Sequence, residues 1–315
     1  MRILFTGSSS FTGSWFLHTL AEAGHGVVAT FRSPLDAYER VRARRVADVA
    51  GVADATAGVA FGDAGFLELL RGGEFDVVCH HAAEVTDYRS PAFDVDAAVR
   101  ANTHGLSAIL EALAAQGGSV ILTGSVFESG EGEGDQPLHA FSPYGLSKTL
   151  TAEIFKYRCH EAGVPLGKFV IANPFGPWEE PRFTTYLARC WLGGETARVQ
   201  TPAYVRDNVH VSLLARAYVR FVEETTASGE GYRRLNPSGY VSTQGEFAKR
   251  CAQELSSRIG AECPLELVEQ TEFPEPLVRV NIDPLDPVGL AWDEGGAWDE
   301  LAAYYREAAL SNAWA

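Results

Sequence analysis

The sequence predicts an α/β protein built on a doubly wound parallel sheet, with a smaller α+β unit after it. Over the first half of the 315 residues, short apolar runs alternate with longer amphipathic ones, a spacing typical of strands and helices in a parallel sheet. A glycine-bearing turn follows the first apolar run directly, where such folds begin their first helix. After about residue 173 the alternation loosens and prolines become frequent, which indicates a second, smaller unit.

The expected elements follow from this alternation. Strands are predicted at 2–6, 27–31, 59–61, 76–80, 119–123 and 166–172. Helices are predicted at 12–23, 35–50, 64–70, 95–115 and 144–162, and in the second half near 211–224, 243–259 and 296–308. We assign residues 1–172 to a dinucleotide-binding domain, with 203–225 returning to it, and residues 173–202 and 226–315 to a substrate-binding cap.

Composition excludes several classes of protein. The apolar content of 46% and the charged content of 21% are ordinary for a globular chain, and no apolar run approaches the roughly 20 residues that span a bilayer. Because the first strand begins at residue 2, we expect no signal peptide. Five scattered cysteines without a C-x-x-C pair predict neither disulfides nor a metal site, and they fit a reducing cytoplasm. The formal charge of −15 argues against nucleic acid or a membrane surface as a partner.

The first strand ends in a turn that fits a dinucleotide, Thr6-Gly7-Ser8-Ser9-Ser10-Phe11-Thr12-Gly13. Gly7 permits the tight turn, and Gly13 lets the helix pack closely on the sheet. Ser10 takes the place of the usual middle glycine, so its side chain restricts the approach of a diphosphate to the backbone. The alternative is a glycine-bearing turn that binds no ligand.

The end of the second strand indicates which dinucleotide is bound. An acid is expected there when the adenosine ribose carries a free 2′-hydroxyl, but the sequence reads Phe31-Arg32-Ser33. A planar cation beside a hydroxyl suits a 2′-phosphate, so NADP is favoured over NAD. The alternative is that Arg32 stacks on adenine or points to solvent.

Ser125, Tyr144 and Lys148 form the predicted reaction site. A tyrosine and a lysine four residues apart on a helix share one face, and an ammonium there favours the phenolate. A serine hydroxyl from a neighbouring strand end can hydrogen-bond the same substrate oxygen. Such a trio moves a proton on or off a carbinol or carbonyl oxygen while a hydride moves at its carbon.

Together with further motifs, these residues resemble the extended short-chain dehydrogenase/reductase family, the NAD(P)-dependent nucleotide-sugar epimerases, dehydratases and reductases. The matching segments include Gly62-Asp63, His81-Ala82-Ala83, Asn102, Asn173-Pro-Phe-Gly-Pro177, Arg206-Asp-Asn-Val-His-Val211 and, more weakly, Asn281-Ile-Asp283 with Gly289-Leu-Ala-Trp292. The agreement covers nearly the whole chain. It implies a Rossmann fold, a nucleotide-sugar substrate and a homodimer formed by the helices that hold Asn102 and Tyr144.

The resemblance also implies residue roles. Tyr144 resembles the family's acid/base, Lys148 its pKa-lowering partner that also holds the nicotinamide ribose, and Ser125 the hydroxyl that orients the carbonyl. The residues expected to contact the cofactor are Gly7, Ser9, Ser10, Phe11, Thr12, Gly13, Phe31, Arg32, Ser33, Asp63, Ala64, His81, Ala82, Ala83, Asn102, Thr123, Tyr144, Lys148 and Asn173. Those expected to contact the substrate are Glu84, Ser125, Val126, Asn173, Arg182, Arg206 and Arg279. For His81 a structural role or one at the edge of the substrate is favoured over a catalytic one, and each of the three arginines has a surface charge as its alternative.

The segment after Ser125 bears on the reaction type. The family's 4,6-dehydratases resemble one another in an Asp-Glu pair directly after the orienting hydroxyl, whereas Val126 and Phe127 follow Ser125 here and the first acid is Glu128. Sugar dehydration is therefore disfavoured. A 4-keto sugar reductase using NADPH and a nucleotide-sugar 4-epimerase with tightly bound NAD(P)⁺ remain, and Arg32 favours the reductase. A catalytically silent dinucleotide-binding sensor is a third possibility, against which the intact trio argues.

Overall fold

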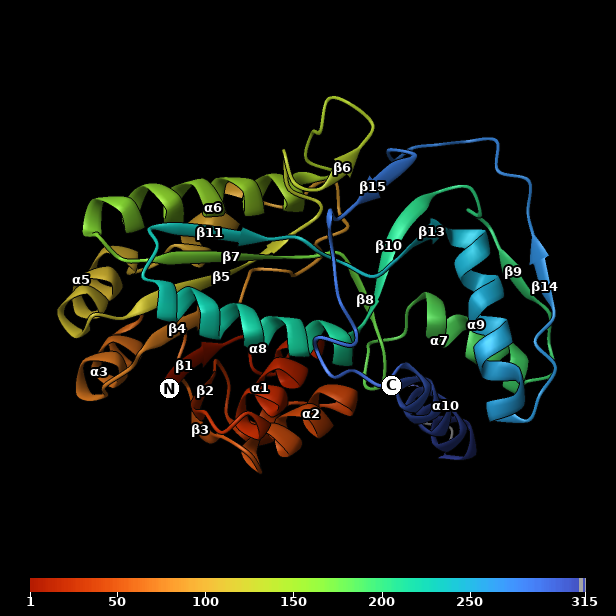
Figure 1. The fold of residues 1–315 in the computed structure, drawn as a ribbon, viewed down its shortest axis with the longest axis horizontal. Helices are drawn as coiled ribbons and strands as arrows, with labels where there is room; N and C mark the ends of the chain where they lie inside the picture. The colour runs from red at the N-terminus through yellow and green to blue at the C-terminus, as the bar shows by residue number, and fades with distance from the viewer. Residues whose placement is uncertain (312–313, 315) are drawn as a thin grey trace.

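A seven-stranded parallel sheet in the order β11-β7-β5-β4-β1-β2-β3 is the centre of the computed structural model, which describes residues 1–311 and 314 (Figure 1). Its strands are β1 (Arg2–Thr6), β2 (Gly26–Phe31), β3 (Asp54–Ala57), β4 (Val77–His80), β5 (Ser119–Ser125), β7 (Leu166–Ile171) and β11 (Tyr232–Leu235). Every neighbouring pair is parallel. The chain runs outward from β1 to β3 and then crosses back to β4, so the switch point lies between β1 and β4. The predicted fold class is confirmed.

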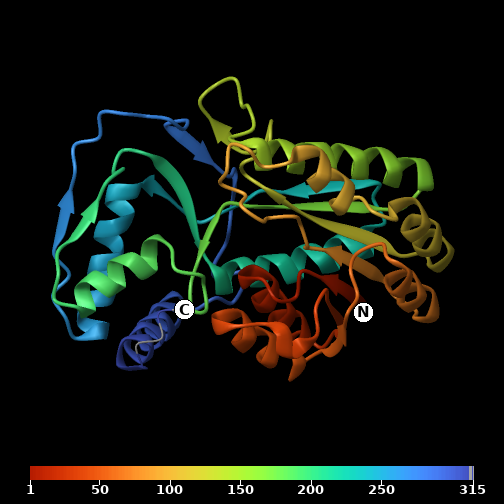
Figure 2. The same ribbon diagram turned by 180° about the vertical axis from the view of Figure 1, so that it is seen from behind.

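Helices cover both faces of this sheet (Figures 1 and 2). One face carries α1 (Phe11–Glu22), α2 (Arg40–Ala50) and α8 (Val211–Ser228), and the other carries α3 (Ala64–Gly72), α5 (Leu106–Gln116) and α6 (Pro143–Ala162). The helix α4 (Val95–Asn102) lies against α6, and the short helix η1 (Leu35–Ala37) precedes α2. Because successive strand residues point to opposite faces, Ile3 and Phe5 enter the first core while Leu4 enters the second.

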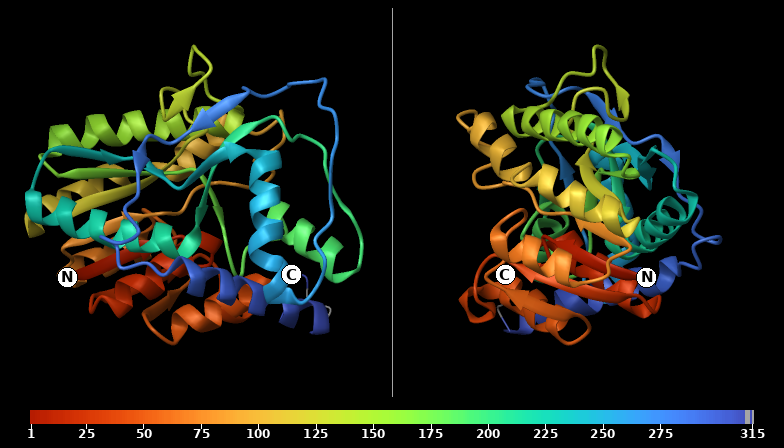
Figure 3. Two further views of the ribbon diagram at one scale, coloured as in Figure 1. Left: turned by 45° about the vertical axis from the view of Figure 1, so that its right-hand side comes forward. Right: turned by 90° about the vertical axis from the view of Figure 1, so that its left-hand side faces the viewer.

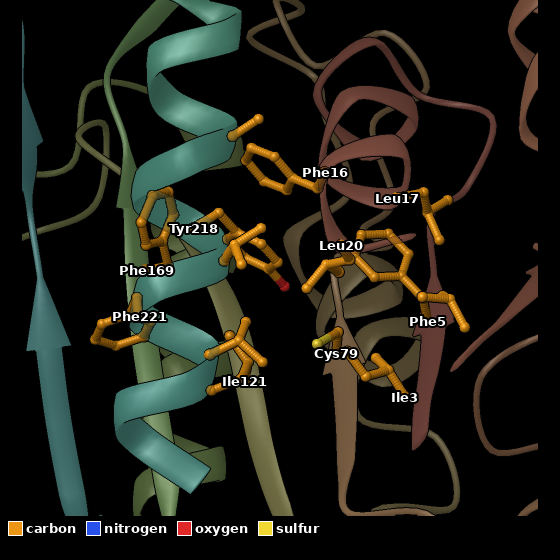
Figure 4. Packing of buried hydrophobic residues seen from close by; sticks show 14 of the residues in the cluster. Ile3, Phe5, Phe16, Leu17, Leu20, Cys79, Ile121, Phe169, Tyr218 and Phe221 are labelled. Atoms are coloured by element: carbon orange, nitrogen blue, oxygen red, sulfur yellow. The ribbon is translucent and has the colours of Figure 1, made fainter. Parts of the chain in front are cut away.

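The core between the sheet and helices α1 and α8 is aromatic (Figure 4). The rings of Phe16 and Tyr218 are stacked with their centroids 4.0 Å apart, and the ring of Phe169 meets both edge-on. All three side chains are fully buried. Such packing fixes α1 on the sheet, and the N-terminus of α1 carries the glycine turn.

Replacing Phe16 with alanine should lower the free energy of unfolding by about 3–5 kcal/mol, because the cavity cannot collapse between two packed rings. Urea unfolding of the purified protein measures this. Phe273→Ala is the matched control, since Phe273 is 48% exposed. A loss below about 1 kcal/mol in Phe16→Ala would contradict the stacking described here.

The second unit stands beside the carboxyl ends of the main strands (Figure 3). It contains a sheet in the order β13-β10-β15-β6, with β8 paired to β10, and two small pairs, β12 with β16 and β14 with β9. The helices α7 (Phe183–Leu192), α9 (Gln244–Ile259) and α10 (Glu294–Ser311) surround their own apolar cluster. The strands are β6 (Glu133–Gly134), β8 (Asn173–Phe175), β9 (Ala197–Val199), β10 (Val205–His210), β12 (Pro237–Ser238), β13 (Tyr240–Thr243), β14 (Leu265–Leu267), β15 (Val278–Val280) and β16 (Asp283–Pro284). Within the described residues, no helix combines the length and the apolarity needed to cross a membrane.

Three expectations about elements were wrong, and one helix was missed. The third strand lies at Asp54–Ala57 rather than at 59–61, because the polar run 54–57 forms the ladder with β2 and the apolar run that follows is buried as a loop. The helix expected over 95–115 is broken into α4 and α5, and α7 was not expected at all. Residues 232–235, assigned to the cap, lie in the main sheet as β11.

The break between α4 and α5 has a steric cause. Gly105 has a φ of +63°, and a Cβ on it would lie 2.5 Å from the Gly62 carbonyl oxygen. A Cβ on Gly62 would in turn lie 1.9 Å from the His104 carbonyl oxygen. The two backbones therefore cross where only glycine fits, and this contact is invisible in the periodicity of residues 95–115.

Candidate active site

The glycine turn after β1 is closed by its own side chains. Gly7 has a φ of +80°, and a Cβ on Gly13 would lie 2.4 Å from the Gly7 carbonyl oxygen. Ser10 is the N-cap of α1: its hydroxyl accepts from the Gly13 N–H at 3.1 Å and donates to the Gly7 carbonyl at 2.8 Å. The Ser10 side chain thus points into the turn, which leaves the outer side of the backbone open at this non-glycine position.

The start of α1 fits a dinucleotide diphosphate. The Ser10 N–H donates to the Gly7 carbonyl at 3.1 Å and is therefore not available to a diphosphate. The Gly13 and Ser14 N–H groups are also taken, by the side chain and the carbonyl of Ser10. In a helix the first N–H groups lack partners inside the helix and attract anions. Phe11 and Thr12 are therefore the residues whose N–H groups would hold the diphosphate.

His81 ties this turn to β5. Its Nδ1 lies 2.8 Å from the Thr123 hydroxyl, and its Nε2 lies 3.0 Å from the Thr12 hydroxyl and 3.1 Å from that of Ser10. Burial, with the Lys148 charge adding to it, lowers the pKa of His81 to about 3. A histidine that stays neutral and has both nitrogens engaged is a structural bridge, in agreement with the role favoured from the sequence.

Three histidines, His80, His81 and His210, should make the protein sensitive to acid. Burial lowers the pKa of each to about 3, so the folded protein keeps them neutral while the unfolded chain protonates them near pH 6.5. Stability is then lost as the pH falls below about 6.5, with a slope of roughly 1.4 kcal/mol per pH unit for each histidine.

Urea unfolding at pH 7.5, 6.5 and 5.5 tests this expectation. His81→Gln should make the loss of stability between pH 6.5 and 5.5 smaller by roughly 1 kcal/mol, and His160→Gln, on a side chain that is 87% exposed, is the control. An equal slope in wild type and His81→Gln would show that His81 does not contribute.

The residues at the end of β2 are placed differently from one another. Phe31 is buried, whereas the Arg32 side chain is 67% exposed, with Nη1 3.8 Å from a carboxylate oxygen of Glu84. The Ser33 N–H donates to the Tyr38 hydroxyl at 3.4 Å. The Arg32 guanidinium is thus free to meet a ligand. Asp63 caps α3, its carboxylate accepting from the N–H groups of Phe66 and Ala60, which gives it a structural role beside the expected adenine contact.

The expected acid/base pair, Tyr144 and Lys148, lies at the start of α6. Ser142 is the N-cap and Pro143 the first helical residue, which places Tyr144 in the first turn and Lys148 one turn further along the same face. Lys148 is buried, and its ammonium donates to the Thr123 carbonyl at 2.6 Å. Thr123 and Ser125 are both near the end of β5, so the pair lies where the sheet meets the expected cofactor crevice.

Burial dominates the electrostatics of this pair. It lowers the pKa of Lys148 to about 8, while the Glu128 charge opposes the shift and the Lys168 charge adds to it. Burial, then the Glu128 charge and Tyr88, raise the pKa of Tyr144 above its ordinary value. We expected Lys148 to lower the pKa of Tyr144, but in the protein without ligands burial outweighs this and the pKa is raised. A further positive charge beside Tyr144 would be needed to reverse it.

Aromatic neighbours that the sequence did not point to enclose Tyr144. The rings of Tyr88 and Phe93 meet the Tyr144 ring edge-on, with centroids 5.5 and 6.0 Å away. Both lie in the irregular segment between β4 and α4, where no periodic pattern could single them out. Asn102 joins this segment to α6, since its side chain accepts from the Glu84 N–H at 2.8 Å and donates to the Thr151 hydroxyl at 3.4 Å.

The expected substrate residues differ in how free they are. The Arg279 side chain is buried and donates to the carbonyls of Val126 and Glu128. Arg206 donates to the Glu275 carboxylate at 2.9 Å and lies over the Tyr204 ring. Arg182 is 40% exposed and close enough to Tyr144 for its charge to oppose the rise in the pKa of that phenol. Of the three arginines, Arg182 has the most exposed side chain and pairs with Glu179 at 3.6 Å, while Arg279 supports the turn after β5.

Comparison with known proteins decides the family. Residues 3–235 match the family described as NAD dependent epimerase/dehydratase. The chain belongs to this family. Over 236 residues it is 26% identical to UDP-glucose 4-epimerase of Mycolicibacterium smegmatis, a match that covers 70% of this chain and 72% of that protein.

Solved structures agree on the fold of this family member. A UDP-glucose 4-epimerase from Thermotoga maritima with UDP-glucose is 21% identical, with a TM-score of 0.72 over 98% of this chain and 99% of that one. A UDP-glucuronic acid 4-epimerase from Bacillus cereus with UDP-glucuronic acid and NAD gives 18% and 0.70 over 98% and 99%. A dTDP-glucose 4,6-dehydratase from Streptomyces venezuelae with NAD gives 21% and 0.69 over 98% and 97%. At these identities the likeness shows the fold alone.

Proposed function

We propose that the protein is a 4-epimerase of a nucleoside-diphosphate sugar that works with a tightly bound dinucleotide. One observation carries the proposal: Tyr144 and the buried Lys148 are fixed at the end of β5, the ammonium on the Thr123 carbonyl, beside the turn that fits the diphosphate. A phenol and an ammonium so placed can exchange the proton of a sugar hydroxyl in both directions. Reversible proton exchange at one oxygen is what epimerisation requires.

The residues act in a definite order in this proposal. Tyr144 takes the proton of the C4 hydroxyl, and Ser125 orients that oxygen from the end of β5. When bound, the dinucleotide would accept the hydride from C4 and give it back to the opposite face of the same carbon, and in its oxidised form it would supply a positive charge near the phenol. After the keto sugar has turned, Tyr144 returns the proton to the C4 oxygen. Lys148, whose ammonium donates to the Thr123 carbonyl, would hold the nicotinamide ribose beside the phenol of Tyr144.

Dehydration is disfavoured by the geometry of Glu128 as well as by its position in the sequence. The carboxylate is 1% exposed, accepts from the Ser125 N–H at 2.7 Å and is paired with the ammonium of Lys168. An acid engaged in this way cannot protonate a leaving hydroxyl of a sugar. The 26% identity to a UDP-glucose 4-epimerase supports an epimerase and makes UDP-glucose the first substrate to test.

The purified protein should release oxidised dinucleotide when it is denatured, and it should interconvert UDP-glucose and UDP-galactose without added cofactor. Chromatography of the released nucleotide and of the sugar products measures both. Turnover that requires added NADPH, with one product formed for each NADPH consumed, would contradict the epimerase proposal.

Arg32 favours a second candidate, a 4-keto sugar reductase that uses NADPH. No acid stands at the end of β2, and the exposed guanidinium is available for a 2′-phosphate. Under this candidate Arg32→Ala should weaken NADPH binding by roughly 10- to 100-fold and leave NADH binding unchanged. Fluorescence titration with both cofactors measures the ratio. Equal loss for both cofactors would assign Arg32 to another contact.

We further propose a homodimer formed through α4 and α6. Leu146, Leu150 and Tyr157 share one face of α6 and are 43%, 40% and 61% exposed. Light scattering at micromolar concentration should give twice the chain mass, and Leu150→Glu should give the monomer.

A further inference from the structure

A buried ion pair lies directly behind the reaction site. The Glu128 and Lys168 side chains are 1% and 3% exposed, and the Lys168 ammonium donates to the Glu128 carboxylate. The same ammonium donates to the Glu131 carboxylate at 2.8 Å. Burying charges is costly unless they are paired and hydrogen-bonded. Two apolar residues would fill this space at lower cost, so the charges of Glu128 and Lys168 point to a function that requires them.

The pair packs against the last residues of β5. Lys168 lies on the neighbouring strand β7, opposite Leu122. The second oxygen of Glu128 accepts from the Ser125 N–H at 2.7 Å. A Cβ on Gly124 would lie 2.7 Å from Lys168 Cε and 3.0 Å from Glu128 Oε1, so the glycine lets the pair approach the strand. Glu128 thus holds the residue whose hydroxyl is expected to orient the substrate.

The same strand end also holds the acid/base lysine. Lys148 donates to the carbonyl of Thr123, and Glu128 accepts from the N–H of Ser125, two residues further along β5. Arg279 donates to the carbonyls of Val126 and Glu128 and so fixes the turn from its other side. The carboxylate is consequently held in one position relative to α6.

We propose that Glu128 is a positioning residue of the reaction site: paired with Lys168, it fixes the Ser125 turn and places a carboxylate behind Tyr144 and Lys148. It acts through these groups and does not touch the substrate, because its carboxylate is closed to solvent. This inference rests on the proposed function for its catalytic meaning, although the placement of the charge stands without it.

The neighbouring charges agree with this role. The Glu128 charge raises the pKa of both Tyr144 and Lys148. The other groups that act on these two are Tyr88, Arg182 and Lys168. Burial and then the Lys148 charge in turn lower the pKa of His80 and His81. Glu131, which shares Lys168, is bound by Asn236 at 2.9 Å and by Arg234 at 3.4 Å. Glu128 is the one of the two acids that acts on the phenol.

Replacing Glu128 with glutamine keeps an oxygen for the Ser125 N–H but removes the charge. With the negative charge gone, the phenolate of Tyr144 forms more easily, so its titration should move to lower pH by about one pH unit. Fluorine NMR of protein labelled with 3-fluorotyrosine measures this without substrate, and Tyr144→Phe assigns the signal among the 11 tyrosines. In the pH profile of kcat, the midpoint that reports deprotonation of Tyr144 should also move to lower pH.

The triple variant Glu128→Gln, Glu131→Gln and Lys168→Met guards against unfolding, because it removes all three charges of the buried cluster together. It should show the same displacement of the Tyr144 titration. Glu133→Gln, on the exposed start of β6, is the control and should show none. A purely structural role would lower stability while leaving the Tyr144 midpoint in place, and a midpoint within about 0.2 pH unit of wild type in the triple variant would overturn the proposal. If the midpoint moves but no nucleotide sugar is epimerised, the proposed function fails and the placement of the charge stands.

Discussion

Replacing Tyr144 with phenylalanine should lower kcat for epimerisation by about 10³-fold and leave dinucleotide binding intact. General acid–base catalysis contributes roughly 10²- to 10⁴-fold, and the phenol is the group that the proposal gives this work in both half-reactions. The phenylalanine ring keeps the ring-to-ring packing with Tyr88 and Phe93. Steady-state kinetics with UDP-glucose and titration with NAD measure the two effects separately.

Tyr157→Phe is the matched control for this prediction. Tyr157 lies on the same helix, is 61% exposed and faces away from β5. It should keep wild-type kcat. Unchanged turnover in Tyr144→Phe would remove the phenol from the mechanism and would favour a dinucleotide-binding protein without this chemistry.

Replacing Lys168 with methionine should lower the free energy of unfolding by about 3–5 kcal/mol. The substitution leaves two carboxylates, Glu128 and Glu131, buried without their shared cation, and uncompensated buried charge is among the costliest defects in a folded protein. Urea unfolding at pH 7.5 measures the loss. The triple variant with Glu128→Gln and Glu131→Gln should recover most of it, since no buried charge then remains.

The destabilisation caused by Lys168→Met should depend on pH. Burial alone would raise the pKa of Glu131, but the charge and hydrogen bond of Lys168 outweigh it and hold the pKa below its ordinary value. A carboxylate with a lowered pKa stabilises the fold above its unfolded pKa, near 4.5, and the contribution is lost as the pH falls. The difference between wild type and Lys168→Met should therefore shrink towards pH 4. A difference that is small at pH 7.5, or independent of pH, would contradict the ion pair described here.

Local patterns in the sequence were sufficient for much of the fold and for the reaction site. The glycine turn, the ladder of apolar strands and helix α6 each follow from a period or a capping residue. Tyr144 and Lys148 were found because a helix places residues four apart on one face. Each of these signals depends on neighbours in the chain.

What could not be predicted depends on contacts between distant segments. Glu128 and Lys168 are 40 residues apart, so no local pattern in either segment could predict that they pair. The break between α4 and α5 results from the crossing of Gly62 and Gly105. Ser10 was expected to hinder the diphosphate, but its hydroxyl turns inward to the Gly7 carbonyl. The direction of the Tyr144 pKa was also misjudged, because burial and Glu128 could be seen only in the fold.

The most direct test of the account follows the hydrogen at C4 of the sugar. UDP-glucose carrying deuterium at C4 is incubated with the purified protein, and the UDP-galactose formed is examined by mass spectrometry and NMR. Since the hydride leaves C4 and returns to the same carbon within one active site, nearly all of the deuterium should be found at C4 of the product, without solvent exchange. Loss of the label to solvent or to free cofactor would contradict a 4-epimerase that keeps its dinucleotide bound.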